Sequence, residues 1–482
     1  MPKHIHPSII QGGMGVAVSN WRLARAVSLC GELGVVSGTF LDNLLARRLQ
    51  DGDLDGSVRR AIRQFPFQDI AESVFQTYFI EGGKAKKSPY KLVPMHSLKS
   101  APLATSLTLL ANFIEVFLAK EGHEGLIGIN YLTKIDLPTL PSLYGAMLAG
   151  VDYVLMGAGI PKAIPGILDK LSTGQAVSLK VDVSGASPED CYELTFDPSD
   201  FDKAKKQKLK RPFFIAIVSS SVLAQSLSKK ASGSVDGFVI EHHSAGGHNA
   251  PPRGGTTVDG KGEPKYGSKD EPDPLEFQKC GRPFWFAGSC ASSEKLFAAL
   301  ETGAQGIQVG TAFAYCEESG ISPEIKQRVI EKVLDGTAEV FTDPRASSSG
   351  YPFKVVRLEG TMSEPNEYAQ RNRICDAGYL RSAYKTESGA VGFRCAAEAV
   401  DDYVRKGGKL EDCDGRKCLC NGLLATAGFA QIQANEYEEL PLLTAGKDLL
   451  SIRQFFSESA RSYSAAEVIA SLLGRKLALK SN

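Results

Sequence analysis

One histidine that follows a buried-looking strand and two glycines is the residue best placed for chemistry. Residues 235–240 are mostly apolar, and the run after them reads Glu-His-His-Ser-Ala-Gly-Gly-His and ends at His248. Gly246 and Gly247 let a ligand approach the backbone closely because no Cβ stands in the way. An imidazole has an unperturbed pKa of about 6.5, so His248 can accept a proton near neutral pH with little tuning. We therefore predict that His248 is a catalytic base or a substrate contact.

Two further strand ends carry a glycine beside a hydroxyl group, which is the composition of a phosphate cradle. Ala287, Gly288 and Ser289 follow one apolar run, and Gly310 and Thr311 follow the next. In parallel barrels the loops after the last two strands commonly bind phosphate through backbone N–H groups. We predict that these five residues hold the phosphate of a cofactor.

The first and third strand ends suit the flat part of such a cofactor. Gly12, Gly13 and Met14 offer a backbone edge and a soft thioether to an aromatic ring system. Asn130 could bond a ring carbonyl or N–H, and a local backbone cap is the competing interpretation of this residue. We predict that all four residues bind the cofactor ring.

Two polar side chains near His248 are candidates for contact with the substrate. His243 lies close to the predicted strand end, and Arg253 follows a Pro-Pro pair. Arg253 could hold an anionic substrate, and a solvated surface charge is the alternative for it.

The elements that must position these residues alternate along the first two-thirds of the chain. Short β-branched runs and helical runs follow one another, as in a parallel sheet with crossover helices. Eight runs read as strands, near residues 8–11, 34–38, 126–130, 153–157, 213–218, 238–241, 284–287 and 307–309. Eight parallel strands favour an α/β fold of the (β/α)8 TIM barrel type over an open doubly wound sheet.

The barrel is predicted to span residues 1–336 and to carry two insertions. Residues 40–124, after the second strand, are mostly helical in pattern and could form a lid or a stabilising flap. The run 176–183 would be a ninth strand, so we place residues 177–212 in a second insertion. Residues 337–482 are predicted to be a linker followed by a mostly helical region that contains cysteines.

Composition narrows the class of protein. The 482 residues carry 55 basic and 55 acidic side chains, which argues against nucleic acid or an anionic membrane as the main partner. The first residues lack the layout of a secretion signal, and ten cysteines without such a signal indicate a reducing compartment. The long apolar stretch 101–119 is interrupted by Asn112 and Glu115, which favours a packed or lid helix over a membrane span. We expect a soluble cytoplasmic protein.

Five cysteines gather near the end of the chain, and they are Cys375, Cys395, Cys413, Cys418 and Cys420. Their spacing could hold zinc or an iron–sulfur cluster, but it lacks a Cys-x2-Cys knuckle. We interpret them as buried free thiols and predict no metal site.

Taken together, the motifs resemble the nitronate monooxygenase family, formerly called 2-nitropropane dioxygenases, which also includes flavin-dependent enoyl-acyl-carrier-protein reductases. They occur in the family's order over about residues 5–335. The motifs are Ile10-Gln-Gly-Gly-Met-Gly, Gly128-Ile-Asn130, Met156-Gly-Ala-Gly-Ile-Pro161, Ser244-Ala-Gly-Gly-His248, Ala287-Gly-Ser289 and Gln308-Val-Gly-Thr311.

The resemblance implies FMN as the cofactor, with its phosphate on the loops at Gly288 and Gly310 and its ring near Gly12 and Asn130. It implies an oxidoreductase in which a nitronate reduces the flavin, oxygen reoxidises it, and a carbonyl compound leaves with nitrite. His248 would then be the catalytic base or substrate contact.

This sequence departs from the family at several places. Some relatives carry a lysine on the strand at 213–218, and this chain has none there, so we expect Lys180 to be its substitute near the ring. The insertion at 40–124 and the long loop after His248 resemble the branch that includes the enoyl reductase subunit of polyunsaturated fatty acid synthases. An NAD(P)H-dependent enoyl reductase, served by an acyl carrier protein, is therefore the alternative function. A non-catalytic partner or electron-transfer subunit is a second alternative, and either form could be a homo-oligomer.

Overall fold

Eight parallel strands form the centre of the protein in the computed structural model, which describes residues 6–202, 208–255, 257–457 and 461–475. Their order around the sheet is β1-β11-β10-β9-β8-β4-β3-β2. They are β1 (Ile9–Gln11), β2 (Gly34–Ser37), β3 (Ile127–Leu132), β4 (Tyr153–Gly157), β8 (Phe213–Val218), β9 (Gly237–Glu241), β10 (Phe284–Ala287) and β11 (Gly306–Val309).

The sheet closes on itself between its first two strands. A parallel bridge joins Ile10 to Leu33, and the Gln11 N–H donates to the Leu33 carbonyl at 3.0 Å. Alternate side chains point inward and fill the barrel, among them Val35, Ile215 and Trp285. The prediction of a (β/α)8 barrel is therefore confirmed, and the open doubly wound sheet is wrong.

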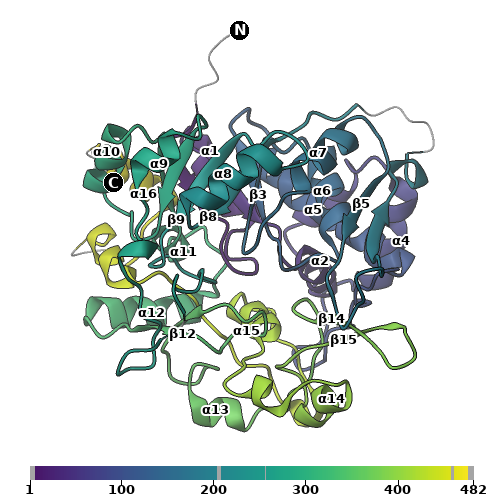
Figure 1. The fold of residues 1–482 in the computed structure, drawn as a ribbon. Coiled ribbons are helices and arrows are strands. Elements are labelled where there is room, and N and C mark those ends of the chain that lie inside the picture. The colour runs from purple at the N-terminus through teal and green to yellow at the C-terminus, as the bar shows by residue number, and fades with distance from the viewer. Residues whose placement is uncertain (1–5, 203–207, 256, 458–460, 476–482) are drawn as a thin grey trace.

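Helices surround the barrel and pack on the outward faces of the strands (Figure 1). The crossover helices are α1 (Trp21–Leu29), α6 (Thr139–Leu148), α7 (Ile164–Ser172), α8 (Ser221–Lys230), α9 (Pro274–Gln278), α10 (Ser293–Glu301), α11 (Thr311–Ala314) and α12 (Pro323–Leu334). The segment between β2 and β3 adds α2 (Leu41–Gln50), α3 (Ser57–Ile62), α4 (Gln68–Tyr78) and α5 (Pro102–Lys120). This helical insertion after the second strand agrees with the sequence.

Helix α5 is apolar enough to cross a membrane by length and composition. Its most apolar window has a mean hydropathy of 1.5, but 72% of that window is buried inside the protein. Asn112 and Glu115 are buried on this helix, where Asn112 accepts a hydrogen bond from Tyr131 and Glu115 accepts one from the Trp21 N–H. The helix therefore packs within the core, as the two polar residues predict.

The run at 176–183 forms strands outside the barrel. β5 (Val177–Lys180) pairs with β7 (Glu193–Phe196) in a separate antiparallel sheet. β6 (Val183–Ser184) instead pairs with β14 (Ser382–Lys385) of the C-terminal region.

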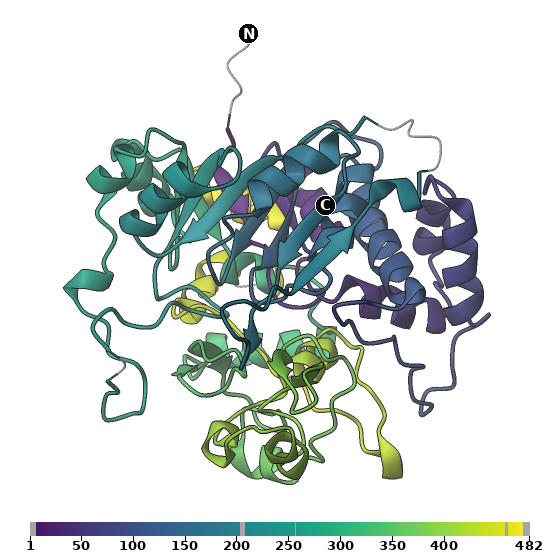
Figure 2. The same ribbon diagram turned by 45° about the vertical axis from the view of Figure 1, so that its right-hand side comes forward.

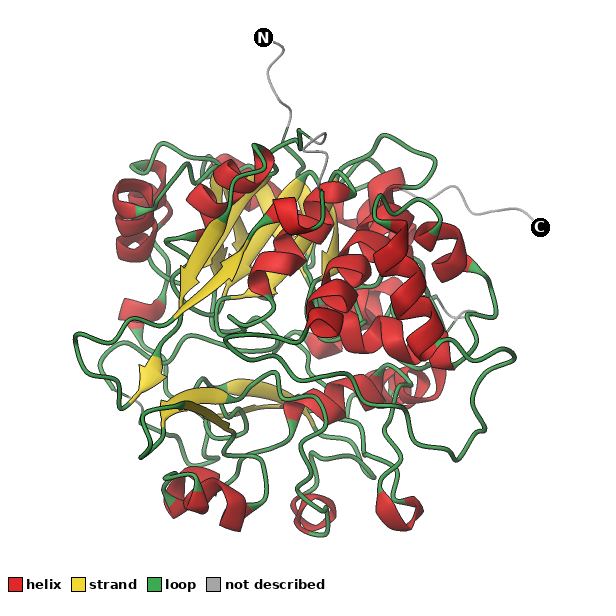
Figure 3. Ribbon diagram, turned by 90° about the vertical axis from the view of Figure 1, so that its right-hand side faces the viewer, coloured by secondary structure: helices red, strands yellow, loops and turns green. Residues whose placement is uncertain are grey.

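The chain after residue 336 lies across the carboxyl ends of the barrel strands. In Figures 2 and 3 the strand arrows point toward a second layer built from this region. Its elements are β12 (Val340–Asp343), β13 (Phe353–Val356), α13 (Pro365–Ala369), β14, β15 (Val391–Arg394), α14 (Val400–Arg405) and α15 (Leu419–Thr426). The last helix, α16 (Ala465–Leu472), returns to the outside of the barrel and packs against α1 and α10 (Figure 1).

The C-terminal region is less helical than we predicted. Two antiparallel strand pairs and long loops occupy much of it. Residues 352–356 contain β-branched and aromatic side chains that suit a strand, and a Ser-Gly turn at 388–389 connects β14 to β15. The expected linker at 343–352 is packed, with Ala346 and Ser347 fully buried.

Candidate active site

A cavity of about 1530 Å³, counted out to its open mouth, lies at the carboxyl ends of the barrel strands. Twelve of the fifteen predicted site residues line it. These are Gly12, Gly13, Met14, Asn130, Gly246, Gly247, His248, Ala287, Gly288, Ser289, Gly310 and Thr311.

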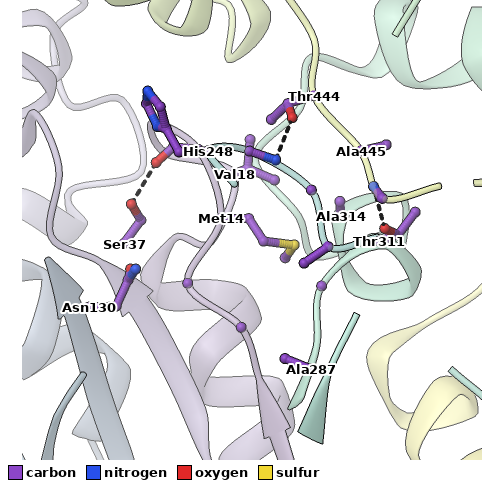
Figure 4. A pocket seen from close by; sticks show the side chains of 18 of the residues that line it. Met14, Val18, Ser37, Asn130, His248, Ala287, Thr311, Ala314, Thr444 and Ala445 are labelled. Carbon is purple, nitrogen blue, oxygen red and sulfur yellow. Dashed lines mark hydrogen bonds between the residues drawn. The ribbon is translucent and has the colours of Figure 1, made fainter. Parts of the chain in front are cut away.

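Two buried oxygens at one side of the cavity have no hydrogen-bond partner among the described residues. They are Asn130 Oδ1 and Gln308 Oε1, and both side chains line the cavity. Gly13 lies directly against Asn130, because a Cβ built on Gly13 would stand 1.9 Å from Asn130 Oδ1. A buried acceptor is costly to leave unsatisfied, so these oxygens fit a ligand that donates N–H groups at this glycine edge. A flavin ring has such a donor. Figure 4 shows Asn130 beside Ser37 at the ends of adjacent strands.

The loop after β10 has the backbone of an anion cradle. Gly288 and Ser289 have positive φ values of 104° and 51°, a turn that directs successive N–H groups to one side. Neither Ser289 nor Cys290 donates its N–H to an acceptor in the described part of the chain. Helix α10 begins just beyond, with Ser292 as its N-cap. This geometry fits a phosphate group.

His248 is held from the C-terminal region. Its Nε2 lies 2.7 Å from Ser347 Oγ, which in turn lies 2.7 Å from Ser349 Oγ. The Phe353 ring packs edge-on against the imidazole at 4.9 Å between centroids. Burial, and then the nearby Lys134 charge, lower the pKa of His248 to about 4. The imidazole is therefore neutral at physiological pH and acts as a hydrogen-bonding group more readily than as a strong base.

The segment 442–448 covers the cavity, and sequence analysis missed it. The Gly247 N–H donates to Thr444 Oγ1 at 2.8 Å, and the Gly446 N–H donates to Thr311 Oγ1 at 2.9 Å (Figure 4). Gly446 is required there because a Cβ would meet Thr311 Oγ1 at 2.9 Å. The small residues Thr-Ala-Gly at 444–446 were the only signal of this close approach in the sequence.

Comparison with known proteins finds a family that part of this chain resembles. The sequence model described as "Nitronate monooxygenase" matches residues 162–359, which is less than half of the chain.

Similarity to individual proteins is more limited. A curated "Probable nitronate monooxygenase" of Bacillus subtilis (strain 168) is 32% identical over 138 residues, which are 29% of this chain and 37% of that protein. The match thus spans little more than a third of the relative's length.

Solved structures with a similar arrangement include two proteins and one enzyme domain. FabK from Thermotoga maritima aligns with 98% of this chain and 93% of its own at 14% identity and a TM-score of 0.45. Nitroalkane oxidase from Streptomyces ansochromogenes aligns with 97% of this chain and 95% of its own, at 13% identity and a TM-score of 0.45. The enoyl reductase domain of MlnA from Bacillus amyloliquefaciens aligns with 97% of this chain and 94% of its own, at 12% identity and a TM-score of 0.47. These scores are low, so the fold rests on the strand order and barrel closure described above.

Three predicted site residues lie outside the main cavity of the nitronate monooxygenase-like barrel. Lys180 is exposed on β5, so the expectation that it approaches the cofactor ring is wrong. It failed because the run that carries it lies outside the barrel. His243 and Arg253 line a second, smaller cavity. Arg253 donates through Nη2 to the Ser219 carbonyl at 2.6 Å, while the His243 ring stacks on Tyr266.

A half-buried acid lines both cavities, and a buried lysine lies near it; sequence analysis missed both. Glu241, at the end of β9, lines both spaces. Burial raises the pKa of Glu241 to about 7, although the charge of Lys354 opposes this shift. Burial lowers the pKa of Lys354 to about 7, and its Nζ donates to the His243 carbonyl and to Asn249 Oδ1. Both groups can therefore change protonation near neutral pH.

Proposed function

We propose that this protein is an FMN-dependent oxidoreductase of the nitronate monooxygenase type. The observation that carries the proposal is a pair of unsatisfied oxygens, Asn130 Oδ1 and Gln308 Oε1, in a cavity that also contains the loop at Gly288 and Ser289, which can cradle a phosphate. FMN bound there would supply a two-electron acceptor for the substrate.

The protein's own groups would bind and orient the substrate. A nitronate is already deprotonated, so it needs a positioning group and no strong base. Neutral His248 can give one hydrogen bond to such a substrate while Ser347 fixes the other ring nitrogen. Segment 442–448 and Phe353 would exclude water from the cavity.

A spectrum followed by a reductive titration tests this proposal. The purified protein should carry one FMN, which an alkyl nitronate should bleach without oxygen, and nitrite should appear when air is admitted. His248→Gln should keep the flavin and lose most of the nitronate reaction, with Arg253→Gln as the control outside the cavity. A protein that is colourless after incubation with FMN would overturn the cofactor assignment.

Reduction of an enoyl thioester is the second candidate, and the lining of the cavity favours it. Neither lysine nor arginine lines the cavity among the described residues, His248 is neutral, and the acids in the lining are Glu241 and Asp448. An anionic nitronate therefore has no cation to pair with, whereas the apolar lining suits an acyl chain. Bleaching by NADPH, followed by reoxidation with a crotonyl thioester but not with a saturated one, would select this function. An acyl carrier protein would be the natural carrier of that substrate.

A further inference from the structure

Four of the five C-terminal cysteines meet at one small cavity. Cys375, Cys395, Cys418 and Cys420 all line it, although they come from three separate stretches of chain. Their thiols are free, and Cys395, Cys418 and Cys420 are buried. The fifth cysteine, Cys413, is buried elsewhere in the region, in a cluster with Tyr403.

A backbone N–H group lies near each of the four sulfurs. These groups belong to Gly378 near Cys375, Ala397 near Cys395, Leu380 near Cys420 and Asn421 near Cys418. A neutral thiol is a weak acceptor, and donors around every sulfur are the outer shell that stabilises metal-bound thiolates.

The charges around this cavity also suit an anionic metal centre. Arg381 and Lys417 line it together with one acid, Glu398, whose carboxylate is paired with Lys406 at 2.8 Å. Four thiolates around a divalent ion carry a net charge of −2, which the two cations would offset.

We propose that Cys375, Cys395, Cys418 and Cys420 bind a metal centre through four thiolates. A tetrahedral zinc ion with Zn–S bonds of about 2.3 Å places its sulfurs about 3.8 Å apart. No three of these sulfurs lie within 4.8 Å of one another in the described structure, so zinc would require the side chains to move closer together. An iron–sulfur cluster spans a wider opening, and both centres use the same four ligands.

This centre would hold the C-terminal region over the active-site cavity. Cys418 is the N-cap of α15, and Cys420 lies in its first turn. Leu423 and Thr426, on the same helix, line the main cavity, and Thr426 Oγ1 donates to the Leu442 carbonyl at 2.8 Å. The metal would thus fix the helix that supports segment 442–448.

Metal analysis of the full-length protein tests the proposal independently of its enzymatic function. After anaerobic purification, we expect either one zinc per chain or iron with an equal amount of acid-labile sulfide. The bound metal should protect four thiols from a thiol reagent, and its removal by a chelator should expose them and lower the melting temperature.

Substitutions then identify the ligands. Cys418→Ser and Cys420→Ser should lose the metal, whereas Cys413→Ser, a buried thiol outside the cavity, should keep it. Folded wild-type protein that binds neither zinc nor iron and sulfide on reconstitution would overturn the proposal, as would a disulfide between any of the four. This measurement on the wild type decides the question even if a serine variant does not fold.

Discussion

Two adjacent glycines allow the cofactor-ring side of the cavity to be tested by a matched pair of variants. In Gly13→Ala the new Cβ would lie 1.9 Å from Asn130 Oδ1 and 2.3 Å from its Cγ, so one of the two residues must move. In Gly12→Ala the nearest atoms would be Gln308 Cγ and the Val309 carbonyl oxygen, both at 3.5 Å, which is ordinary contact. The two changes add the same methyl group at neighbouring positions of one loop.

Overpacking of this kind costs about 1–3 kcal/mol in free energy of unfolding. If Asn130 is displaced from the ring, the binding free energy of FMN should weaken by a similar amount. Each 1.4 kcal/mol corresponds to roughly a tenfold loss of FMN affinity. Gly12→Ala should change both quantities by less than about 0.5 kcal/mol, as expected for a tolerated substitution. FMN affinity can be measured by quenching of flavin fluorescence, and stability by urea unfolding of the flavin-free protein.

A double variant makes the reasoning refutable. Asn130→Ala removes the atoms that the new methyl group would strike, so the stability cost of Gly13→Ala should largely vanish in that background. Equal effects of Gly12→Ala and Gly13→Ala, or a Gly13→Ala penalty that persists without the Asn130 side chain, would show that the glycine edge does not lie against Asn130 as described.

Further predictions concern the polar groups around the cavity. Ser347→Ala should lower kcat/KM about tenfold with little change in flavin content, because His248 loses the partner of its Nε2; an unchanged rate would contradict this role. Because the pKa of His248 is lowered to about 4, any rate that needs the neutral imidazole should stay level from pH 8 to about pH 5 and fall only below it, and a pH–rate profile checks this. Folding raises the pKa of Glu241 from 4.5 to about 7, so its contribution to stability is present below pH 4.5 and is lost as pH rises through 7. At pH 8 the free energy of unfolding of Glu241→Gln should therefore exceed that of the wild type by about 1–2 kcal/mol, after allowance for solvent screening in the cavity. At pH 4.5 the two proteins should be equally stable, and unfolding midpoints at both pH values check this. Thr444→Val should increase the rate of flavin or substrate release several-fold, because the Gly247 N–H loses its acceptor. Stopped-flow measurement of dissociation checks this, and an unchanged rate would contradict it.

The barrel could be predicted because its signals are local. Each strand is a short apolar run followed by a glycine-containing loop, and the inward residues such as Val35 and Ile215 come from the interior of those runs. The carboxyl ends of parallel strands necessarily meet at one face, so the loop residues that follow them were predictable as a cavity lining. The run at 177–180 shows the limit of this reasoning. It has the composition of a strand, but it pairs with β7, so Lys180 lies away from the cavity.

The covering layer could not be predicted because its contacts join residues far apart in the chain. His248 meets Ser347 across 99 residues, and Gly247 meets Thr444 across 197. The segments involved are loops without periodicity, and long loops carry no pattern that reveals what they pack against. The same holds for the four clustered cysteines, whose approach depends on the folding of three separate stretches.

The residues that close the cavity lie largely outside the family match. The match covers residues 162–359, which includes His248 and the loop at Gly288. The glycine edge at Gly13 precedes it, and the residues that close the cavity, from Leu423 to Asp448, follow it. We therefore expect pocket shape and substrate choice to depend on the C-terminal layer. If so, substitutions at Leu423 or Leu443 should change the preference between a nitronate and an enoyl thioester without changing the flavin spectrum, and a flavin spectrum that shifts with them would place these residues at the cofactor instead.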